Sequence, residues 1–415
     1  MKRIKIGIFG SGVRGRTLAE SFMMLNCDIV AVCELKERDA EIEKMKKIVG
    51  ESVAVYYDFK DFIEHEMDAV LLTNNFHEHA PYAIQCFERG VHVFSECISN
   101  GTMAEGVELI RAFEKSNSIY MLAENYPQMI FNREIKRVCD SGTLGKILYA
   151  EGEYNHPADP KDVTFAKDYV YSEDHWRNYL PRTYYITHSL GPVMWATGAT
   201  PKRVTAFAVF APIDAEAPSA RKVGDRVAII TTMNDDGSVF RITGCAAFGA
   251  HHNSYRVCGT KGQIENLRGM GEQVMLRYNK WDIPEGAQRN ELYTPKWNDA
   301  DEDLIVKSGH GGGDYLTART FVNCIRNGEQ PEHPFDIYSA VAMSSVAILG
   351  HRSVLEGGAP YDIPDFKNES DRKKYEDDRL TPFYINGNPP SLPCCSKTDY
   401  EPSEDQVKRY RDLLK

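Results

Sequence analysis

The first third of the chain alternates short apolar runs with amphipathic stretches. Strand-like runs are predicted at 4–9, 28–33, 68–73 and 91–94, and helices at 14–25 and 80–89. Near-continuous apolar strands that alternate with helices indicate a parallel sheet covered on both faces. We therefore expect an N-terminal α/β domain with a doubly wound parallel sheet, over residues 1–122.

The pattern changes after Met121 to strands that alternate apolar and polar positions. Strands are predicted at 147–154, 204–210, 227–233, 238–248 and 255–258, and helices at 131–141, 315–327 and 337–355. The run Asn234-Asp235-Asp236-Gly237 is typical of a hairpin turn. Residues 123–365 are thus predicted to form an α+β domain with a large, mostly antiparallel open sheet that holds a substrate. The charged segment 366–415 is predicted to be a tail that wraps the surface or a neighbouring subunit.

Charge and composition exclude several classes of protein. The 415 residues carry a net charge of −11 and contain no basic block, which argues against nucleic-acid binding. No run of about 18 apolar residues predicts a membrane span, and the N-terminus shows no secretion signal. The ten cysteines are scattered without zinc-ligand spacing. We expect a cytoplasmic protein with free thiols and no membrane or nucleic-acid partner.

A glycine-rich motif follows the first predicted strand and opens the first helix: Gly10-Ser11-Gly12-Val13-Arg14-Gly15. Such glycines allow a tight turn, close approach of backbone N–H groups to a pyrophosphate, and close helix packing, as in a Rossmann domain. Glu34 ends the second strand, where a carboxylate accepts hydrogen bonds from the adenosine ribose. A carboxylate at this position repels the 2′-phosphate of NADP, so NAD is favoured as the cofactor. The nearby positive charges of Arg14 and Lys36 weaken this preference.

Two further segments resemble the glucose-fructose oxidoreductase, inositol dehydrogenase and MocA family (Gfo/Idh/MocA). They are Asp68–Pro81 and Gly90–Ile98. Asn74-Asn75 stands where that family has Thr-Pro, and Glu96-Cys97-Ile98 stands where it has Glu-Lys-Pro. The resemblance implies that Glu96 contacts the nicotinamide-side ribose. The family lysine that assists removal of the substrate hydroxyl proton is replaced by Cys97.

The stretch Tyr184-Tyr185-Ile186-Thr187-His188-Ser189-Leu190-Gly191-Pro192 narrows the resemblance to the branch of NAD-dependent α-N-acetylgalactosaminidases. That branch also lacks the lysine, and the resemblance covers residues 4–366. It implies redox-neutral cleavage of a glycoside: the C3 hydroxyl is oxidised with bound NAD, the C2 proton is removed, the C1 substituent is eliminated, water adds, and the ketone is reduced again.

The same resemblance assigns candidate roles in this reaction. Tyr154 would be the base at C2, His188 would act on the C3 hydroxyl in place of the lysine, and Tyr185 would contact substrate or relay a proton. If their segment is helical, Tyr185 and His188 share a face; the choice between Tyr185 and Tyr184 stays open. Further candidate substrate contacts are Glu124, Tyr184, Thr187, Tyr255 and His310. Further candidate cofactor contacts are Asn74, Asn75, His79, Cys97 and Asn125.

Three functions remain open at this point. The leading hypothesis is the glycosidase; the alternatives are a net NAD-dependent sugar or inositol dehydrogenase, and a non-catalytic NAD-binding sensor. No metal is expected, because His251-His252 and His77-x-His79 lack a further ligand at suitable spacing. A pocket lined by aromatic residues and histidines with little charge favours a neutral carbohydrate. Analogy with other open sheets predicts a homo-oligomer.

Overall fold

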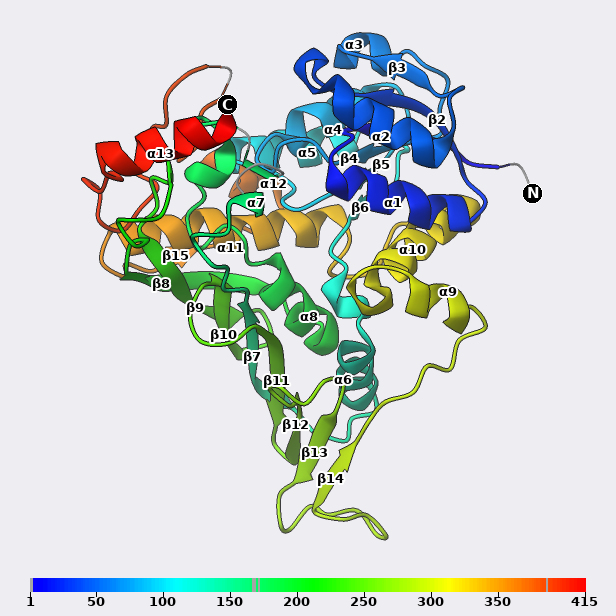
Figure 1. Ribbon diagram of the computed structural model, residues 1–415. Coiled ribbons are helices and arrows are strands. Elements are labelled where there is room, and N and C mark those ends of the chain that lie inside the picture. Colours follow the sequence, from blue (N-terminus) through cyan, green and yellow to red (C-terminus); the bar gives the residue numbers. More distant parts are fainter. Residues whose placement is uncertain (1–2, 166–168, 171, 386) are drawn as a thin grey trace. The chain divides into compact units, whose positions relative to one another are not determined.

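The computed structural model describes residues 3–165, 169–170, 172–385 and 387–415, and these form two compact units (Figure 1). The first comprises residues 1–137, 294–341 and 366–377, and the second comprises 138–293, 342–365 and 378–415. The predicted division at residue 122 falls at the end of a strand of the first unit. The segment 294–341, which we had assigned to the second domain, belongs to the first unit.

The first unit contains a six-stranded parallel sheet of order β3-β2-β1-β4-β5-β6. Its strands are β1 (Lys5–Phe9), β2 (Asp28–Cys33), β3 (Ala54–Tyr56), β4 (Ala69–Leu72), β5 (His92–Ser95) and β6 (Tyr120–Leu122). The order reverses between β1 and β4, as in dinucleotide-binding folds. Every residue of β4 is buried, which explains its uninterrupted apolar sequence.

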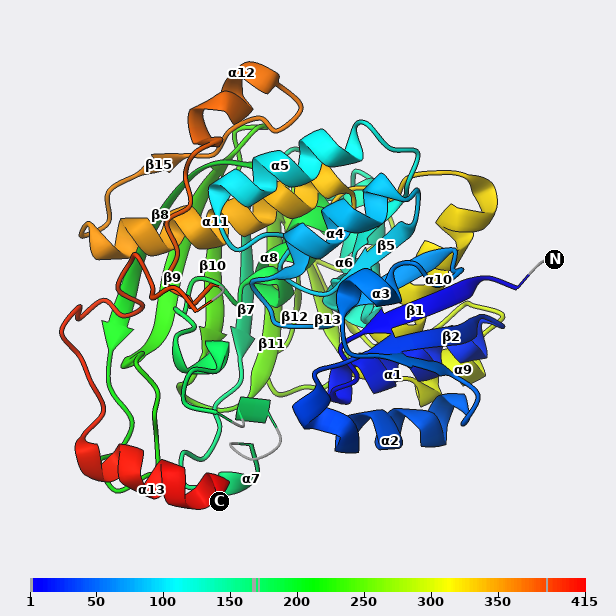
Figure 2. The ribbon, with the colours of Figure 1, turned by 90° about the horizontal axis from the view of Figure 1, so that it is seen from above.

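The first unit also contains helices, some of which pack on this sheet (Figure 2). They are α1 (Val13–Met24), α2 (Asp39–Val49), α3 (Phe59–Phe62), α4 (His79–Glu88), α5 (Met103–Phe113), α6 (Ile130–Asp140), α9 (Glu302–Lys307), α10 (Gly313–Asn327) and α12 (Glu369–Arg372). Short 3-10 turns are η1 (Lys36–Arg38), η2 (Tyr126–Gln128), η5 (His310–Gly312) and η6 (Lys373–Tyr375). The predicted α/β architecture is confirmed.

Aromatic packing explains why α10 belongs to the first unit. Phe321 on α10 lies 5.2 Å from Phe94 on β5 and 6.2 Å from Phe22 on α1, measured between ring centroids. All three rings are fully buried. Burying three phenyl rings removes a large apolar area from water, so this contact fixes α10 beside α1 (Figure 1).

The second unit contains a nine-stranded sheet of order β14-β13-β12-β11-β7-β10-β9-β8-β15. Only the β7–β10 pair is parallel among the strand pairs described. The strands are β7 (Ile147–Asn155), β8 (Pro201–Phe210), β9 (Asp225–Asn234), β10 (Val239–Ala246), β11 (His252–Gly259), β12 (Gly262–Asn266), β13 (Val274–Tyr278), β14 (Asn290–Tyr293) and β15 (Tyr361–Asp362). The predicted, mostly antiparallel sheet is confirmed.

The described residues of this part of the chain form the helices α7 (Val163–Phe165), α8 (Thr187–Thr197), α11 (Ile337–Leu355) and α13 (Glu404–Leu414), with the 3-10 turn η4 (Trp176–Asn178). Helix α8 packs on β7, β10 and β11. No helix in the described ranges has the length and apolar character needed to cross a membrane.

The segment 366–415 folds onto the chain itself. Residues 366–377 join the first unit, where Arg372 donates to a carboxylate oxygen of Glu114 at 2.7 Å. Residues 378–415 join the second unit, where Asp378 pairs with Arg352 at 2.5 and 2.6 Å. Near the end of the chain, Tyr410 on α13 is buried against Val170 and Ala220. Ion pairs and a small apolar cluster therefore anchor the charged tail.

Candidate functional site

The glycine-rich loop of the first unit connects β1 to α1. Gly10 has φ +99°, and a Cβ there would lie 2.5 Å from the Thr73 carbonyl oxygen; a Cβ on Gly15 would lie 2.2 Å from the Gly10 carbonyl oxygen. At Gly12 the nearest atom would be 3.8 Å away. No side chain caps the start of α1 at Gly12. The close backbone contacts at Gly10 and Gly15 therefore require glycine. Gly12 instead leaves open space next to the uncapped N–H groups of the helix, which suits a pyrophosphate.

Glu34 lies at the end of β2 beside this loop. Its Oε2 accepts hydrogen bonds from the backbone N–H of Ser11 at 2.9 Å and from the Ser11 hydroxyl at 3.1 Å. The Arg38 guanidinium lies 3.6 Å from the same oxygen. The carboxylate is thus buried and held next to the glycine loop, where it fits the ribose-binding role expected for NAD.

A partly buried ionic network continues from Arg14 in the same loop. Arg14 pairs with Glu96 through Nε and with Asp314 Oδ1 through Nη1, the latter at 2.7 Å. Asn125 Nδ2 donates to Asp314 Oδ1 at 2.7 Å, and His310 Nδ1 lies 2.8 Å from Asp314 Oδ2. Three predicted site residues, Arg14, Asn125 and His310, therefore contact Asp314, and Glu96 joins them through Arg14.

The network fixes the charge of Asp314. Burial alone would raise the pKa of this carboxyl, but the hydrogen bond from His310 and the positive charge of Arg14 outweigh burial and hold its pKa well below the usual range. No role was assigned to Asp314 from the sequence. The proximity of Arg14 and Asp314, 300 residues apart, has no local sequence signal.

The other predicted cofactor residues lie nearby in the first unit. Asn75 donates to Glu78 at 2.8 Å in the turn before α4, and Asn74 precedes it. His79 is buried, and its Nδ1 lies 2.8 Å from the Ile98 carbonyl oxygen; burial lowers its pKa. The Cys97 thiol donates to Glu124 Oε2 at 3.4 Å.

Glu124 is fully buried, and its Oε1 accepts from the backbone N–H of Tyr126 at 3.0 Å. Both oxygens of the Glu124 carboxylate therefore accept hydrogen bonds from within the chain.

The second unit brings together an aromatic and histidine cluster at the end of β7 and the start of α8. Tyr154 and His188 have ring centroids 5.0 Å apart, Tyr185 and His188 5.3 Å, and Tyr154 and Tyr185 5.9 Å. We call these three residues, with His156 and His251, the Tyr/His cluster. Sequence reasoning named the first three as catalytic candidates, and the structure places them in contact.

His156 and His251 extend this cluster toward solvent. Their ring centroids lie 4.6 Å apart, and His156 lies 5.7 Å from Tyr154. Both are exposed. Burial of part of the ring, and then the charges of His251 and His188, lower the pKa of His156. Sequence reasoning missed this pair, although His156 lies two residues after Tyr154 on the same strand face.

The geometry of Tyr185 differs from the expectation. Helix α8 begins at Thr187 with Ile186 as N-cap, so Tyr185 precedes the helix and does not share a helical face with His188. The two rings meet because the chain turns sharply before the helix.

Tyr184 points elsewhere: it is fully buried, 5.2 Å from Phe383 and 6.0 Å from His351. Thr187, the first residue of the helix, is buried.

Two contacts fix α8 against the sheet. A Cβ on Gly152 of β7 would lie 1.9 Å from the Ser189 carbonyl oxygen, so only glycine permits this approach. The Tyr255 hydroxyl donates to the His188 carbonyl oxygen at 2.5 Å, and Tyr255 is buried. Tyr255, a predicted substrate contact, therefore supports the backbone of His188.

Neighbouring charges lie on the opposite face of the sheet. Glu153, next to Tyr154 in sequence, accepts from Arg268 at 3.0 Å, and its Oε1 lies 2.6 Å from His252 Nε2. Because successive side chains of a strand point to opposite faces of the sheet, His252 and His251 lie on different faces. Among the described residues, no three His, Cys, Asp or Glu side chains gather in a metal-binding arrangement. The cluster offers phenol and imidazole groups, which suit proton transfer.

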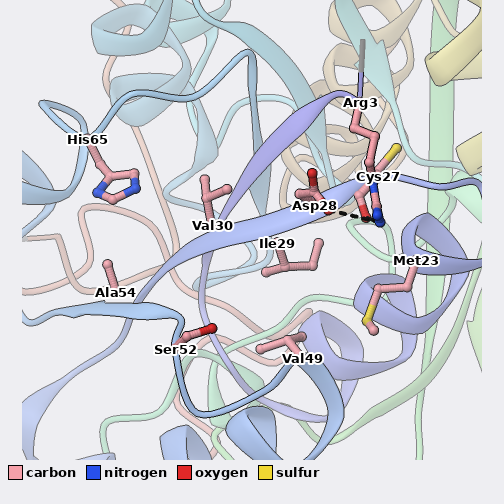
Figure 3. Close-up of a pocket in the computed structure, with 10 residues that line it drawn as sticks. All are labelled: Arg3, Met23, Cys27, Asp28, Ile29, Val30, Val49, Ser52, Ala54 and His65. Atoms are coloured by element: carbon pink, nitrogen blue, oxygen red, sulfur yellow. Dashed lines mark hydrogen bonds and ion pairs between the residues drawn. The ribbon is translucent and has the colours of Figure 1, made fainter. Parts of the chain in front are cut away.

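A surface pocket in the first unit contains none of these residues (Figure 3). It lies at the amino end of β2, where Arg3 pairs with Asp28 at 2.8 Å. Because β1 and β2 are parallel with Lys5 opposite Asp28, the glycine loop is at the other end of these strands. The pocket is therefore separate from the cofactor residues.

Comparison with known families matches both parts of the chain. Residues 4–124 match the oxidoreductase family with an NAD-binding Rossmann fold (Gfo/Idh/MocA), and residues 134–373 match the C-terminal domain of glycosyl hydrolase 109. The second match covers more than half of the chain.

Individual relatives agree with these matches. The chain is 24% identical over 404 residues to an alpha-N-acetylgalactosaminidase of Shewanella oneidensis, covering 88% of this chain and 85% of that protein. It is 26% identical over 399 residues to a glycosyl hydrolase family 109 protein of Streptomyces filamentosus, covering 88% and 77%.

Solved structures share the fold. A levoglucosan dehydrogenase in complex with NADH and L-sorbose superposes with a TM-score of 0.70 at 17% identity, covering 88% of this chain and 100% of that one. Myo-inositol 2-dehydrogenase from Lactobacillus plantarum superposes with a TM-score of 0.64 at 20% identity, covering 87% of this chain and 100% of that one. With its N-terminal NAD-binding domain of the Gfo/Idh/MocA type, the chain belongs to the glycosyl hydrolase 109 family and is an NAD-dependent enzyme.

Proposed function

We propose that this enzyme cleaves a glycoside without net oxidation, through a transient ketone at C3 of the sugar. The observation that carries the proposal is the contact between Tyr154, Tyr185 and His188, which gathers proton-transferring groups without a lysine. The names of the glycosyl hydrolase 109 relatives support a glycoside as substrate. Bound NAD supplies hydride acceptance from C3 and its return.

Each residue of the cluster has a task in this scheme. His188 takes the proton from the C3 hydroxyl, Tyr154 takes the proton from C2, and Tyr185 contacts the substrate or relays a proton to the leaving oxygen. Loss of the C2 proton expels the C1 substituent as an alcohol. Water then adds at C1 as a proton returns to C2, so the net reaction is hydrolysis.

The substitution of Cys97 for the lysine supports this assignment. The Cys97 thiol is buried and donates to Glu124, so it does not replace the amine as a base. On the first unit, we propose that NAD lies along the glycine loop with its adenosine ribose on Glu34. The division after residue 122 is proposed as the end of the cofactor-binding domain.

Incubation with a panel of aryl glycosides in D2O tests the proposal. We expect released sugar that carries deuterium at C2, with no accumulation of NADH. Stoichiometric NADH with an intact glycosidic linkage would contradict it and favour a net sugar dehydrogenase. NAD binding with no turnover of any sugar, unchanged in His188→Ala, would instead favour a sensor.

A further inference from the structure

Two residues of the C-terminal segment 378–415, Phe383 and Ser396, contact the part of the second unit that carries Tyr185. The glycosyl hydrolase 109 match ends at residue 373, so membership of the family assigns no role to this segment. The segment belongs to the second unit, as do Tyr185 and helix α8. One contact reaches Tyr185 through its neighbour in the chain, and the other reaches it through its own carbonyl group.

The first contact is made by the side chain next to Tyr185. The Tyr184 ring meets the Phe383 ring edge-on, with the ring centroids 5.2 Å apart. Both side chains are inaccessible to solvent. Close packing leaves such rings little freedom to move, so Phe383 restrains the backbone immediately before Tyr185.

The second contact begins at Ser396. Its backbone N–H donates to Asp225 Oδ2 at 2.8 Å, and its hydroxyl donates to Oδ1 of the same carboxylate. The preceding residue, Cys395, accepts at Sγ from the Gly224 N–H at 3.3 Å. Asp225 is the first residue of β9 and is buried. Because a buried carboxylate requires hydrogen-bond donors, Ser396 fixes the start of β9.

Hydrogen bonds connect Asp225 to the backbone of Tyr185. The Asp225 carbonyl oxygen accepts from Arg182 Nε at 2.8 Å, and Arg182 Nη1 donates to the Cys245 carbonyl oxygen at 3.2 Å. The N–H of Cys245 in turn donates to the Tyr185 carbonyl oxygen at 3.0 Å. A Cβ on Gly244 would lie 2.1 Å from the Arg182 carbonyl oxygen, so the backbone packs closely here as well. The chain at Tyr185 is thus held against β10, and its position depends on that of Asp225.

The position of the Tyr185 backbone decides the contacts of its ring within the Tyr/His cluster. The ring lies 5.9 Å from the Tyr154 ring and 5.3 Å from the His188 ring, measured between centroids. A displacement of about 1 Å can cost about 10²-fold in rate when a reacting group is misplaced. Residues that hold such a group in place therefore affect the rate without contacting the substrate.

We propose that Ser396 is a positioning residue for Tyr185, so that the C-terminal segment forms part of the catalytic unit. By binding the Asp225 carboxylate, Ser396 keeps the start of β9 where its carbonyl orients Arg182. Arg182 and Tyr185 then share Cys245 as their partner on β10. The inference rests on the proposed function for the task of Tyr185 in the reaction, whereas the support of its backbone can be measured without turnover.

Steady-state kinetics of full-length variants on an aryl glycoside test the inference. Ser396→Ala removes the hydroxyl that binds Asp225 and keeps the backbone N–H, and we expect kcat to fall about tenfold. Ser396→Thr keeps a hydroxyl and should hold kcat within about twofold of the wild type. The matched control is Ser403→Ala, which removes the N-cap hydroxyl of α13 in the same segment. It should lower Tm but also hold kcat within about twofold.

A double-mutant cycle shows whether Ser396 acts through Tyr185. We expect Ser396→Ala to lower kcat in the wild type but to add little to the loss caused by Tyr185→Phe, because the hydroxyl being positioned is then already absent. Equal losses in the two backgrounds would overturn the inference. A loss of kcat in Ser403→Ala as large as that in Ser396→Ala would also overturn it, since general loosening of the segment would then explain both.

Amide hydrogen exchange gives a readout that requires no turnover. The Cys245 N–H should exchange faster in Ser396→Ala than in the wild type and in Ser403→Ala, because its acceptor is the Tyr185 carbonyl. Asp225→Asn, which replaces one acceptor oxygen by a donor, should give the same increase and serves if Ser396→Ala does not fold. Unchanged exchange would overturn the support of Tyr185. If no glycoside is cleaved, the proposed function fails, while hydrogen exchange still decides the positioning role.

Discussion

The imidazole of His188 meets the ring of Tyr154 edge-on, with their centroids 5.0 Å apart. The two residues belong to different elements, the start of α8 and the end of β7. Their contact depends on Gly152, which lets α8 approach β7, and on the Tyr255 hydroxyl, which binds the His188 carbonyl. The positions of both rings are thus set by groups that carry out no chemistry themselves.

Adjacent tyrosines allow a matched test of the cluster. Tyr185→Phe removes a hydroxyl from a ring that contacts His188, whereas Tyr184→Phe removes one from a ring packed on Phe383. We expect Tyr185→Phe to lower kcat on a glycoside by about 10²-fold or more, as for loss of a proton-transferring group. Tyr184→Phe should keep kcat within about threefold, since the ring stays in place. The opposite ranking in steady-state kinetics would remove Tyr185 from the site.

The cofactor preference depends on Glu34 and its neighbour Arg38. Glu34→Ser removes the carboxylate that is expected to bind the ribose. Arg38, whose guanidinium lies 3.6 Å from that carboxylate in the wild type, is then available for a 2′-phosphate. We expect NAD to bind about tenfold more weakly and NADP to bind more tightly than in the wild type, because one polar contact is lost and one ionic contact is gained. Calorimetric titration of both cofactors measures this. Unchanged affinities for the two would place the ribose away from Glu34.

Several strands of both sheets could be predicted because their apolar patterns are local, whereas β3, β6, β12, β13, β14 and β15 were not predicted. Asp28–Cys33 was predicted with the bounds of β2, and the glycines of the loop follow β1 in a recognisable spacing. The family resemblance also selected Tyr154, Tyr185 and His188 as candidates, and their rings are in contact. Whether the helix includes Tyr185 stayed open in the sequence, because periodicity does not reveal where the N-cap lies; the helix begins at Thr187.

Features that depend on distant contacts could not be predicted. Helix α10 reads as an ordinary amphipathic helix, and only the burial of Phe321 against Phe22 and Phe94 shows which unit it joins. The pairing of Arg14 with Asp314 likewise arises from folding. Nothing in the local composition of these segments indicates their partners.

Asp314 should be essential for the stability of the first unit. Its carboxylate is inaccessible to solvent and accepts from Arg14 and Asn125. Asp314→Asn removes the charge that neutralises Arg14, so we expect the free energy of unfolding to fall by about 3 kcal/mol. The control Asp362→Asn breaks an exposed ion pair with Arg203 and should cost less than about 1 kcal/mol. Urea unfolding compares them, and equal losses would show that the buried network contributes no more than the surface pair.

His351 should make the stability of the enzyme fall in mild acid. It is buried, its Nε2 donates to the Pro393 carbonyl oxygen at 2.7 Å, and burial lowers its pKa to about 4. An unfolded histidine has a pKa of about 6.5, so as the pH falls from about 6.5 to 4 only the unfolded chain takes up this proton. The free energy of unfolding should therefore be lost over that range, by up to about 3 kcal/mol from this group.

The variant His351→Gln isolates this effect, because an amide can still donate to Pro393 but does not titrate. We expect its urea unfolding free energy to lie below that of the wild type at pH 7, where the native packing of the imidazole is intact. The gap should narrow steadily toward pH 4, since the remaining carboxylates titrate alike in both proteins. Parallel curves over the whole range would show that the imidazole has the same pKa in the native and unfolded states, and that its link to the C-terminal segment does not require the neutral form.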